Sequence, residues 1–284
     1  MDRRLYWRPR LLCRRLVGRS DFSRLVARQD ARIVGGDSFC PWRCALTKTL
    51  TVLLPFYNER DTVADAVERL LKTQLPVPLE VILIDDDSTD GSAESLARFV
   101  DEGRATLVRQ PVNKGKGAAI RRGLGLASGQ MVTVLDADLE YDPSDYKDLL
   151  LPLLDGEAEV VYGSRSFTSN TAFSFWYVLG NRFLAFACSF LYNTWLSDIE
   201  TCLKMAPIDV WKGMPLRSNG FGIEAEFTAK VLRSGRKIYE VPISYSARTR
   251  EEGKKLHWTD GIVALGILLA VRLMPRRRLA RSRR

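Results

Sequence analysis

One cluster of carboxylates in this sequence has the composition and spacing of a divalent-metal site. Asp136 and Asp138 flank a single alanine directly after the apolar run 131–135, and Glu140 follows two residues later. On an extended segment the two aspartates can turn to the same side. Neighbouring carboxylates repel one another unless a cation or hydrogen-bond donors compensate them, and oxygen ligands favour Mg²⁺ or Mn²⁺ over Zn²⁺. The pattern therefore predicts a metal site, with a turn of hydrogen-bonded carboxylates as the alternative.

Two more polar clusters follow apolar runs, and a segment rich in lysine and glycine lies beyond them. The clusters are 55–59, after the run 50–54, and 85–87, after the run 80–84. The segment 113–117 reads Asn-Lys-Gly-Lys-Gly and fits neither a dinucleotide-binding nor a Walker pattern, because Ile120 interrupts the first and no Gly-Lys-Ser/Thr occurs. Glycines near a helix start let the backbone approach a ligand, and the lysines add positive charge, so we expect a diphosphate nearby.

The elements that must position these residues alternate along the chain. Period-2 and apolar runs predict strands, whereas apolar residues three and four apart predict helices. The expected strands are 50–54, 80–84, 105–108, 131–135, 158–161 and 237–241, and the expected helices are 63–71, 92–101, 116–127, 144–154, 223–234 and 260–273. This order predicts an α/β doubly wound, mostly parallel sheet, in which ligands bind beyond the carboxyl ends of the strands.

Charge divides the 284 residues into three parts. Residues 1–48 carry 12 basic and 4 acidic groups, and residues 272–284 carry seven arginines and no acid, which leaves 49–271 with a net charge of −6. We expect a basic flexible extension over 1–48, a catalytic domain over 49–250, and an amphipathic helix with an arginine-rich tail over 251–284. A nucleic-acid-binding fold would be basic in its body, so anionic lipid is the expected partner of the ends. A composition of 46% hydrophobic and 27% charged residues excludes collagen and low-complexity disorder.

Two apolar segments could lie in a lipid interface. The segment 172–196 is rich in aromatic residues and is interrupted by Gly-Asn-Arg at 180–182, which favours a pair of helices with exposed aromatics. The segment 262–274 has an apolar stripe followed by Pro-Arg-Arg-Arg. Neither reaches the roughly 18 to 20 uninterrupted apolar residues of a spanning helix, so we expect no bilayer crossing. Burial in the domain core is the alternative for both.

Taken together, six segments in this order resemble family 2 glycosyltransferases of the GT-A fold, in particular dolichyl- or polyprenyl-phosphate mannose and glucose synthases. The resemblance covers about 49–273. Its segments are Pro55-Phe-Tyr-Asn-Glu59, Asp85-Asp-Asp-Ser-Thr-Asp-Gly91, Asn113-Lys-Gly-Lys-Gly117, Asp136-Ala-Asp-Leu-Glu140, Gly163-Ser-Arg165 and Arg248–Lys255.

The resemblance implies a role for each matching residue. The nucleotide-sugar would be bound by Pro55, Tyr57, Glu59, Asp86, Lys114 and Asp136, the metal by Asp136, Asp138 and Glu140, and the acceptor phosphate by Arg165, Arg248, Lys254 and Lys255. Asp138, Arg165 and Arg248 would be catalytic. Asp198, Thr201, Asn219 and Glu226 also match family positions. Many relatives have Gly at Asp87 and Gln at Glu140, so this chain carries an extra carboxylate at each.

The resemblance implies metal-dependent, inverting transfer of a hexose. The donor would be of the GDP-mannose or UDP-glucose type, the acceptor a polyprenyl or dolichyl phosphate, and the cofactor Mg²⁺ or Mn²⁺. We expect the enzyme on the cytoplasmic face of a membrane, bound peripherally. One alternative is transfer to a hydroxyl of a cell-envelope glycan or glycolipid, with Glu224 or Glu226 as base. Another is a non-catalytic nucleotide-sugar-binding or scaffold protein, which would be expected to lose the metal carboxylates.

Overall fold

The computed structural model describes residues 48–165, 175–247 and 258–275. Within these residues the strands are β1 (Leu50–Phe56), β2 (Leu79–Asp85), β3 (Thr106–Arg109), β4 (Met131–Val134), β5 (Val160–Ser164), β6 (Lys204–Pro207) and β7 (Ile238–Pro242). The α-helices are α3 (Val63–Lys72), α4 (Ala97–Asp101), α5 (Lys116–Leu126), α6 (Tyr146–Leu154), α7 (Phe175–Tyr192), α8 (Ile208–Gly213), α9 (Gly222–Arg233) and α10 (Trp258–Leu273). Two 3₁₀ turns, Glu94–Leu96 and Pro143–Asp145, precede α4 and α6.

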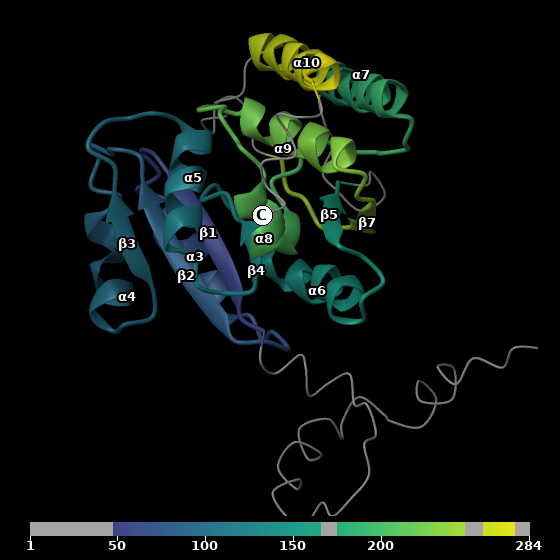
Figure 1. Cartoon of the computed structure of the whole chain (residues 1–284). Coiled ribbons are helices and arrows are strands. Elements are labelled where there is room, and N and C mark those ends of the chain that lie inside the picture. The colour runs from purple at the N-terminus through teal and green to yellow at the C-terminus, as the bar shows by residue number, and fades with distance from the viewer. Residues whose placement is uncertain (1–47, 166–174, 248–257, 276–284) are drawn as a thin grey trace, which may run out of the picture. The chain divides into compact units, whose positions relative to one another are not determined.

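The seven strands form one mostly parallel sheet, as the sequence predicted, in the order β3-β2-β1-β4-β6-β5-β7 (Figure 1). β1 pairs in parallel with β2 and β4, β2 with β3, and β5 with β7. β6 runs antiparallel to both β4 and β5. The parallel strands gather their carboxyl ends at one edge, where the polar clusters of the sequence follow β1, β2 and β4.

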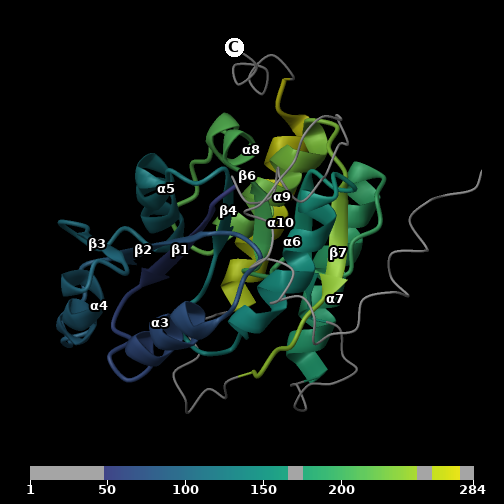
Figure 2. The same ribbon diagram turned by 90° about the horizontal axis from the view of Figure 1, so that it is seen from below.

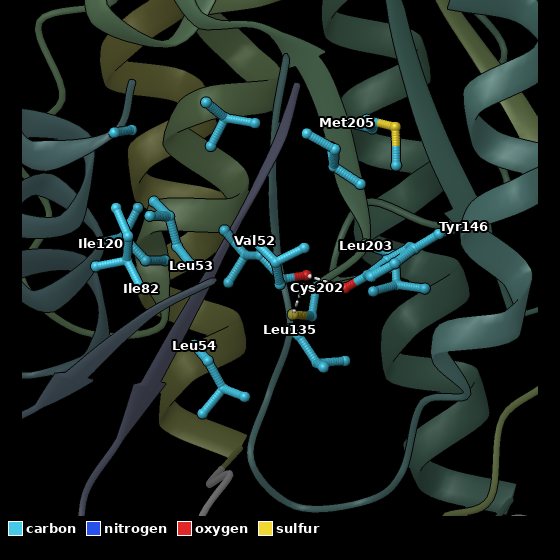
Figure 3. Close-up of a cluster of buried hydrophobic side chains, with 14 of the residues drawn as sticks. Val52, Leu53, Leu54, Ile82, Ile120, Leu135, Tyr146, Cys202, Leu203 and Met205 are labelled. Atoms are coloured by element: carbon cyan, nitrogen blue, oxygen red, sulfur yellow. Dashed lines mark hydrogen bonds between the residues drawn. The ribbon is translucent and has the colours of Figure 1, made fainter. Parts of the chain in front are cut away.

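Helices cover both faces of the sheet, which explains why its central strands β1 and β4 are mostly apolar, with one threonine in each. Every residue of β1 and β4 is buried. In Figure 2, α5 and α8 lie on one side of the sheet and α3, α4 and α6 on the other. Figure 3 shows the core at the centre, where Val52 of β1 lies between Leu53 and Ile120 on one side and Leu203 and Tyr146 on the other. Burial on two faces is what selects continuous apolar runs in place of alternation.

A second, smaller core joins α7, α9 and α10 above the sheet (Figure 1). Leu184 and Cys188 of α7, Ala225 of α9 and Leu268 of α10 belong to it. The prediction of two helices is wrong, because α7 is one continuous helix across 180–182. The residues of α7 that face this core, among them Leu184 and Cys188, stabilise the helix beyond the Gly-Asn-Arg sequence. The expectation of exposed aromatics is confirmed, since the outer side of α7 remains in solvent.

The predicted strands do not include β6, which lies between the parallel strands β4 and β5 in the sheet, and the predicted helices do not include α8, which follows β6. The strand β6 is hard to recognise in the sequence because it has four residues and begins with the charged Lys204, which interrupts the apolar pattern of a buried strand. In the fold Lys204 is 2% exposed, and its ammonium donates to the carbonyl oxygens of Ile199 and Thr201 at 2.7 Å each. The ammonium also lies 4.5 Å from the centre of the Tyr162 ring. A buried charge is tolerated only with such partners.

The expected C-terminal helix is present as α10, and its interfacial role stays a prediction. The basic extension lies outside the described residues except for Lys48, and most of the arginine-rich tail lies outside them as well. Among the helices of the described ranges, none combines the length and apolarity needed to cross a membrane.

Candidate active site

A cavity of about 330 Å³ lies at the carboxyl ends of β1, β4 and β5. This volume is within the range of small-ligand sites. Its walls come from separate segments, and they include Pro55, Phe56, Tyr57, Glu59, Asp86, Asn113, Gly115, Lys116, Asp136, Asp138, Glu140, Tyr141, Arg165, Glu200, Phe221, Glu224 and Tyr245. The topology thus brings together carboxylates and cations that lie far apart in the chain.

Asp86, after β2, holds the lysine- and glycine-rich segment in place. Its Oδ1 accepts from the side-chain amide of Gln110 at 2.6 Å and from the backbone N–H of Lys114 at 2.9 Å. Its Oδ2 accepts from the N–H of Gly115 at 2.7 Å. The carboxylate is 3% exposed and is stabilised by these donors. Its predicted contact with a nucleoside stays a prediction, and the observed contacts position the loop at 113–117.

Arg109 compensates the other two carboxylates of this cluster. Its Nε lies 3.4 Å from an oxygen of Asp85, and its Nη2 lies 3.5 Å from an oxygen of Asp87. Asp87 has φ = 67°, a left-handed conformation in which glycine is favoured. A guanidinium and backbone amides therefore balance the charge of 85–87, and this cluster needs no metal ion for that purpose.

The glycines at 115 and 117 allow close contact between two loops. Gly115 has φ = 90°, and a Cβ there would lie 2.6 Å from the carbonyl oxygen of Asn219. A Cβ on Gly117 would overlap the carbonyl oxygen of Ser218. Arg121 of α5 donates to the same Ser218 carbonyl and to the Asn219 side chain. Gly115 lines the cavity, so its expected approach to a ligand stays a prediction, whereas Gly117 packs against protein backbone.

Lys116 links two carboxylates at the centre of the cavity wall. Its ammonium lies 2.7 Å from Asp136 Oδ1 and 2.7 Å from Glu224 Oε1. The second oxygen of Glu224 is buried and has no hydrogen-bond partner among the described residues. Burial opposes the positive charge of Lys116, but the two carboxylates outweigh it and raise its pKa well above the usual value. The lysine therefore stays charged and draws α5, the end of β4 and α9 together.

The residues after β4 fit a metal site made by two carboxylates. Asp136 and Asp138 both line the cavity, and their carboxylate oxygens are the kind of ligand that Mg²⁺ and Mn²⁺ prefer. Glu140 is 8% exposed, and its carboxylate accepts a hydrogen bond from the Tyr245 hydroxyl. Across 48–165, 175–247 and 258–275, no three His, Cys, Asp or Glu side chains gather as a metal-holding group. The predicted third ligand, Glu140, thus has another partner in this structure, and its metal role stays a prediction.

Arg165, after β5, is anchored by a buried carboxylate. Its Nε and Nη2 lie 2.6 and 2.7 Å from the two oxygens of Asp198, a side-on pair that fixes the guanidinium plane. Its Nη1 lies 3.3 Å from the Tyr177 hydroxyl of α7, and the guanidinium carbon is 5.1 Å from the centre of the Tyr245 ring. Burial disfavours ionised Asp198, but the charge of Arg165 outweighs burial and lowers the pKa of this carboxyl.

Glu200 brings a further carboxyl group into the cavity. Burial, reinforced by the charge of Glu224, raises its pKa to about 7. Burial also lowers the pKa of the neighbouring Lys204 to about 8, against the opposing effect of the nearby carboxylates. This wall of the cavity is therefore the part whose charge changes most readily near neutral pH.

Most of the predicted site residues lie together. Those that line the cavity are Pro55, Tyr57, Glu59, Asp86, Asp136, Asp138, Glu140 and Arg165. Lys114 contributes its backbone to Asp86 and is not among the lining residues. Arg248, Lys254 and Lys255 lie outside the described residues. Asp198 anchors Arg165, Asn219 binds Arg121, and Thr201 is buried. Glu200, Phe221 and Tyr245 also line the cavity but are not among the predicted site residues, because they belong to no motif and follow no predicted strand directly.

The two glutamates considered as a base differ in position. Glu224 lines the cavity. Glu226 accepts hydrogen bonds from the N–H groups of Arg217 and Ser218 and from the ammonium of Lys230, so it clamps the loop before α9. A carboxylate occupied by three donors and absent from the cavity wall is a structural anchor. The role of Glu226 as a base stays a prediction, and of the two glutamates only Glu224 is among the residues that line the cavity.

Comparison with protein families and curated proteins identifies relatives. A model described as glycosyl transferase family 2 matches residues 51–209. The chain is 30% identical over 198 residues to Glycosyltransferase AglJ of Haloferax volcanii, covering 69% of this chain and 63% of that protein. It is 26% identical over 209 residues to Dolichol-phosphate mannosyltransferase of Pyrococcus furiosus, covering 72% and 58%. It is 32% identical over 120 residues to Dodecaprenyl-phosphate galacturonate synthase of Rhizobium johnstonii, covering 41% and 36%. The chain thus spans less than two thirds of these relatives.

Solved structures share the fold. Glucosyl-3-phosphoglycerate synthase from Mycobacterium tuberculosis, in complex with Mn²⁺, uridine diphosphate and glucosyl-3-phosphoglycerate, has a TM-score of 0.63 at 21% identity, covering 86% of this chain and 88% of that chain. The complex of that protein with Mg²⁺ and uridine diphosphate also has a TM-score of 0.63, at 22% identity and 86% coverage of each chain. At these identities the likeness establishes the GT-A fold.

The contact between the loops around Gly117 and Ser218 predicts the effect of a methyl group. Gly117→Ala forces the two backbones apart, and we expect it to destabilise the protein by about 1–3 kcal/mol. Gly125→Ala on the same helix is the control, because, apart from the adjacent residues and the helix's own backbone, no atom lies within 4 Å of its Cβ position. The control should raise stability by about 0.5–1 kcal/mol. Thermal unfolding of both variants measures this, and equal melting temperatures would contradict the predicted contact.

Proposed function

Because the chain belongs to glycosyl transferase family 2 and is a glycosyltransferase, we propose that it transfers a hexose from a nucleotide-sugar to a polyprenyl or dolichyl phosphate. The donor is of the GDP-mannose or UDP-glucose type, and the cofactor is Mg²⁺ or Mn²⁺. The observation that carries the proposal is a single cavity with Asp136 and Asp138 after β4 and Arg165 after β5. Two relatives named for dolichol-phosphate and dodecaprenyl-phosphate support the acceptor.

The donor would lie along the carboxyl edge of β1 and β4. Its nucleoside would contact Pro55, Tyr57 and Glu59, and its diphosphate would approach the two aspartates after β4. A divalent ion held there would supply positive charge to the departing nucleoside diphosphate. The protein's own contribution is a fixed arrangement of oxygen ligands, which saves reorganisation during the reaction.

A phosphate acceptor explains why the transfer would not require a general base in the site. A phosphate monoester with a second pKa of about 6 is mostly ionised at neutral pH, so it needs no deprotonation. One of its oxygens forms a bond to the anomeric carbon while the bond from that carbon to the diphosphate oxygen breaks, which inverts the configuration. Arg165, with Arg248, Lys254 and Lys255, would hold the acceptor phosphate against the negative diphosphate.

Metal dependence is tested at Asp138. We expect Asp138→Asn to lower turnover by about two orders of magnitude or more, because it removes a charged ligand of the diphosphate-bound ion. Asp142→Asn is the matched control, since Asp142 is exposed and caps the turn before α6. The assay is release of nucleoside diphosphate with Mn²⁺ or with EDTA. Undiminished activity in EDTA would falsify the metal requirement.

The nature of the acceptor is tested with two lipids that differ in one group. Polyprenyl phosphate should support release of nucleoside diphosphate, whereas the corresponding polyprenol should not. Transfer to a hydroxyl would require a base, for which Glu224 is the candidate in the cavity. Activity with polyprenol that Glu224→Gln abolishes would favour the hydroxyl-acceptor alternative. Glu226→Gln serves as the comparison, because Glu226 is not among the residues that line the cavity, and thermal unfolding shows whether the variant stays folded.

The outer sides of α7 and α10 support a peripheral position on an anionic membrane. We name as the α7–α10 apolar surface the exposed residues Trp176, Leu179, Phe183, Phe186, Phe190, Ile262, Leu269 and Leu273. The two helices pack against each other, and the Tyr192 hydroxyl donates to the carbonyl of Leu268 at 2.7 Å. Aromatic and aliphatic side chains on an exposed helix face are typical of interfacial helices. The arginines that follow α10 in the sequence complement anionic headgroups.

Vesicle flotation tests this position. The full chain should float with anionic vesicles at low salt, since each arginine near the surface contributes about 1 kcal/mol. A chain ending at residue 275 should bind less, and the Phe183→Ser, Phe190→Ser double variant should bind less at every salt concentration. Leu151→Ser, an exposed position on α6, is the control and should float as the full chain does.

Two outcomes would contradict parts of this proposal. If no form of the protein floats under any condition, membrane association is wrong. If the full and shortened chains float equally with neutral vesicles at high salt, the role of the arginines is wrong, because electrostatic attraction is screened under those conditions.

A further inference from the structure

The segment between α7 and β6 is held on several sides by side chains. The N–H groups of Ser197 and Asp198 donate to the Glu240 carboxylate of β7 at 3.0 and 3.2 Å. The N–H of Glu200 donates to Asp198 at 3.1 Å. Asp198 is the same carboxylate that anchors Arg165. The turn and the guanidinium at this end of the cavity are therefore fixed by one shared group.

The second half of the segment is held by hydrogen bonds from Lys204 and to Tyr141. The Lys204 ammonium donates to the carbonyls of Ile199 and Thr201, which flank Glu200. The N–H of Cys202 donates to the Tyr141 hydroxyl at 3.1 Å. A buried ammonium costs free energy that packing alone would avoid, so its use here indicates that the turn must be held in one conformation.

Glu200 is the residue of the described segment 197–203 that lines the cavity. One of its oxygens, Oε1, is buried and has no hydrogen-bond partner among the described residues. The nearby carboxylates offer no donors when they are ionised, and Arg165 is already paired with Asp198. A buried acceptor without a donor is unfavourable unless a ligand supplies one.

The position of Glu200 within the cavity limits which part of a ligand it can meet. In the proposed function the nucleoside lies near Pro55, Tyr57 and Glu59 and the acceptor phosphate near Arg165. Glu200 lines the cavity from the segment whose Asp198 anchors Arg165. Between a nucleoside diphosphate and an acceptor phosphate lies the transferred sugar. Its hydroxyl groups are hydrogen-bond donors, and both phosphates are acceptors that a carboxylate would repel.

We propose that Glu200 binds hydroxyl groups of the transferred hexose and thereby selects which sugar is transferred. This inference rests on the proposed function, because it assumes a nucleotide-sugar in this cavity. The rigid turn sets the carboxyl group at one position, so an epimer or a deoxy sugar that lacks the matching hydroxyl leaves the group without its donor. A site built to bind a hydroxyl discriminates strongly against a ligand without it.

The experiment compares binding of the nucleotide with binding of the nucleotide-sugar. Isothermal titration calorimetry on the full chain with Mn²⁺ would use GDP with GDP-mannose and UDP with UDP-glucose. For the pair that binds, Glu200→Ala should leave the Kd of the nucleoside diphosphate within about twofold and raise the Kd of the nucleotide-sugar about 10- to 100-fold. Glu200→Gln keeps one acceptor oxygen and the shape of the side chain, so its Kd for the nucleotide-sugar should lie between those of the wild-type protein and Glu200→Ala.

Mono-deoxy analogues of the bound donor identify the hydroxyl. The analogue that lacks the partner of Glu200 should bind the wild-type protein and Glu200→Ala equally, which is the signature of a direct contact in a double-mutant cycle. Thermal unfolding of each variant shows that the turn is intact. An equal loss for nucleotide and nucleotide-sugar, no loss for either, or no analogue that removes the difference would overturn the assignment of Glu200. If the wild-type protein binds no nucleotide-sugar, both the proposed function and the assignment of Glu200 are wrong.

Discussion

The Lys116 ammonium, 2.7 Å from oxygens of both Asp136 and Glu224, is the interaction on which the cavity depends. It joins the start of α5, the segment after β4 and the first turn of α9. Without a cation at this point, two carboxylates would face each other across a largely buried wall, which is strongly unfavourable. The same need for compensation recurs around it, with Arg109 beside Asp85 and the backbone amides around Asp86. The walls of the site are therefore held together by a network of paired charges.

Helix α9 connects this network to the outer layer of helices. Glu224 faces the cavity, whereas Ala225 and Ala229 belong to the small core shared with α7 and α10. Small residues allow α10 to approach closely, and a Cβ on Gly222 would overlap the Ile267 side chain. The helix that carries Glu224 is therefore packed directly against α7 and α10. Tyr177 makes a second connection, because it extends from α7 to Arg165.

The sequence predicted the sheet and much of the cavity for a clear reason. The strands β1 and β4 are buried along their whole length and β2 is buried from Val81 onward, so they appear as mostly apolar runs, and the polar residues that follow them must meet at one edge. The same reasoning failed at β6, where a buried lysine begins a short antiparallel strand. It failed also at 180–182, where glycine, asparagine and arginine suggested a break in what is one helix. In both places a tertiary contact outweighs the local pattern. The Lys204 ammonium donates to carbonyl oxygens of Ile199 and Thr201, and α7 packs against α9 and α10 in the small core.

By itself, the sequence determined the fold class, the family and the set of carboxylates and cations at the carboxyl edge, because these follow from local periodicity and from motifs in a given order. Only the tertiary structure decided which groups pair. Asp86 holds a loop 29 residues away, Arg121 binds Asn219 across 98 residues, and Asp198 holds Arg165 across 33. No periodicity records such pairs, since each depends on how separate loops meet above the sheet. The same physical limit hid Glu200, whose place in the cavity comes from the turn that Lys204 and Asp198 hold.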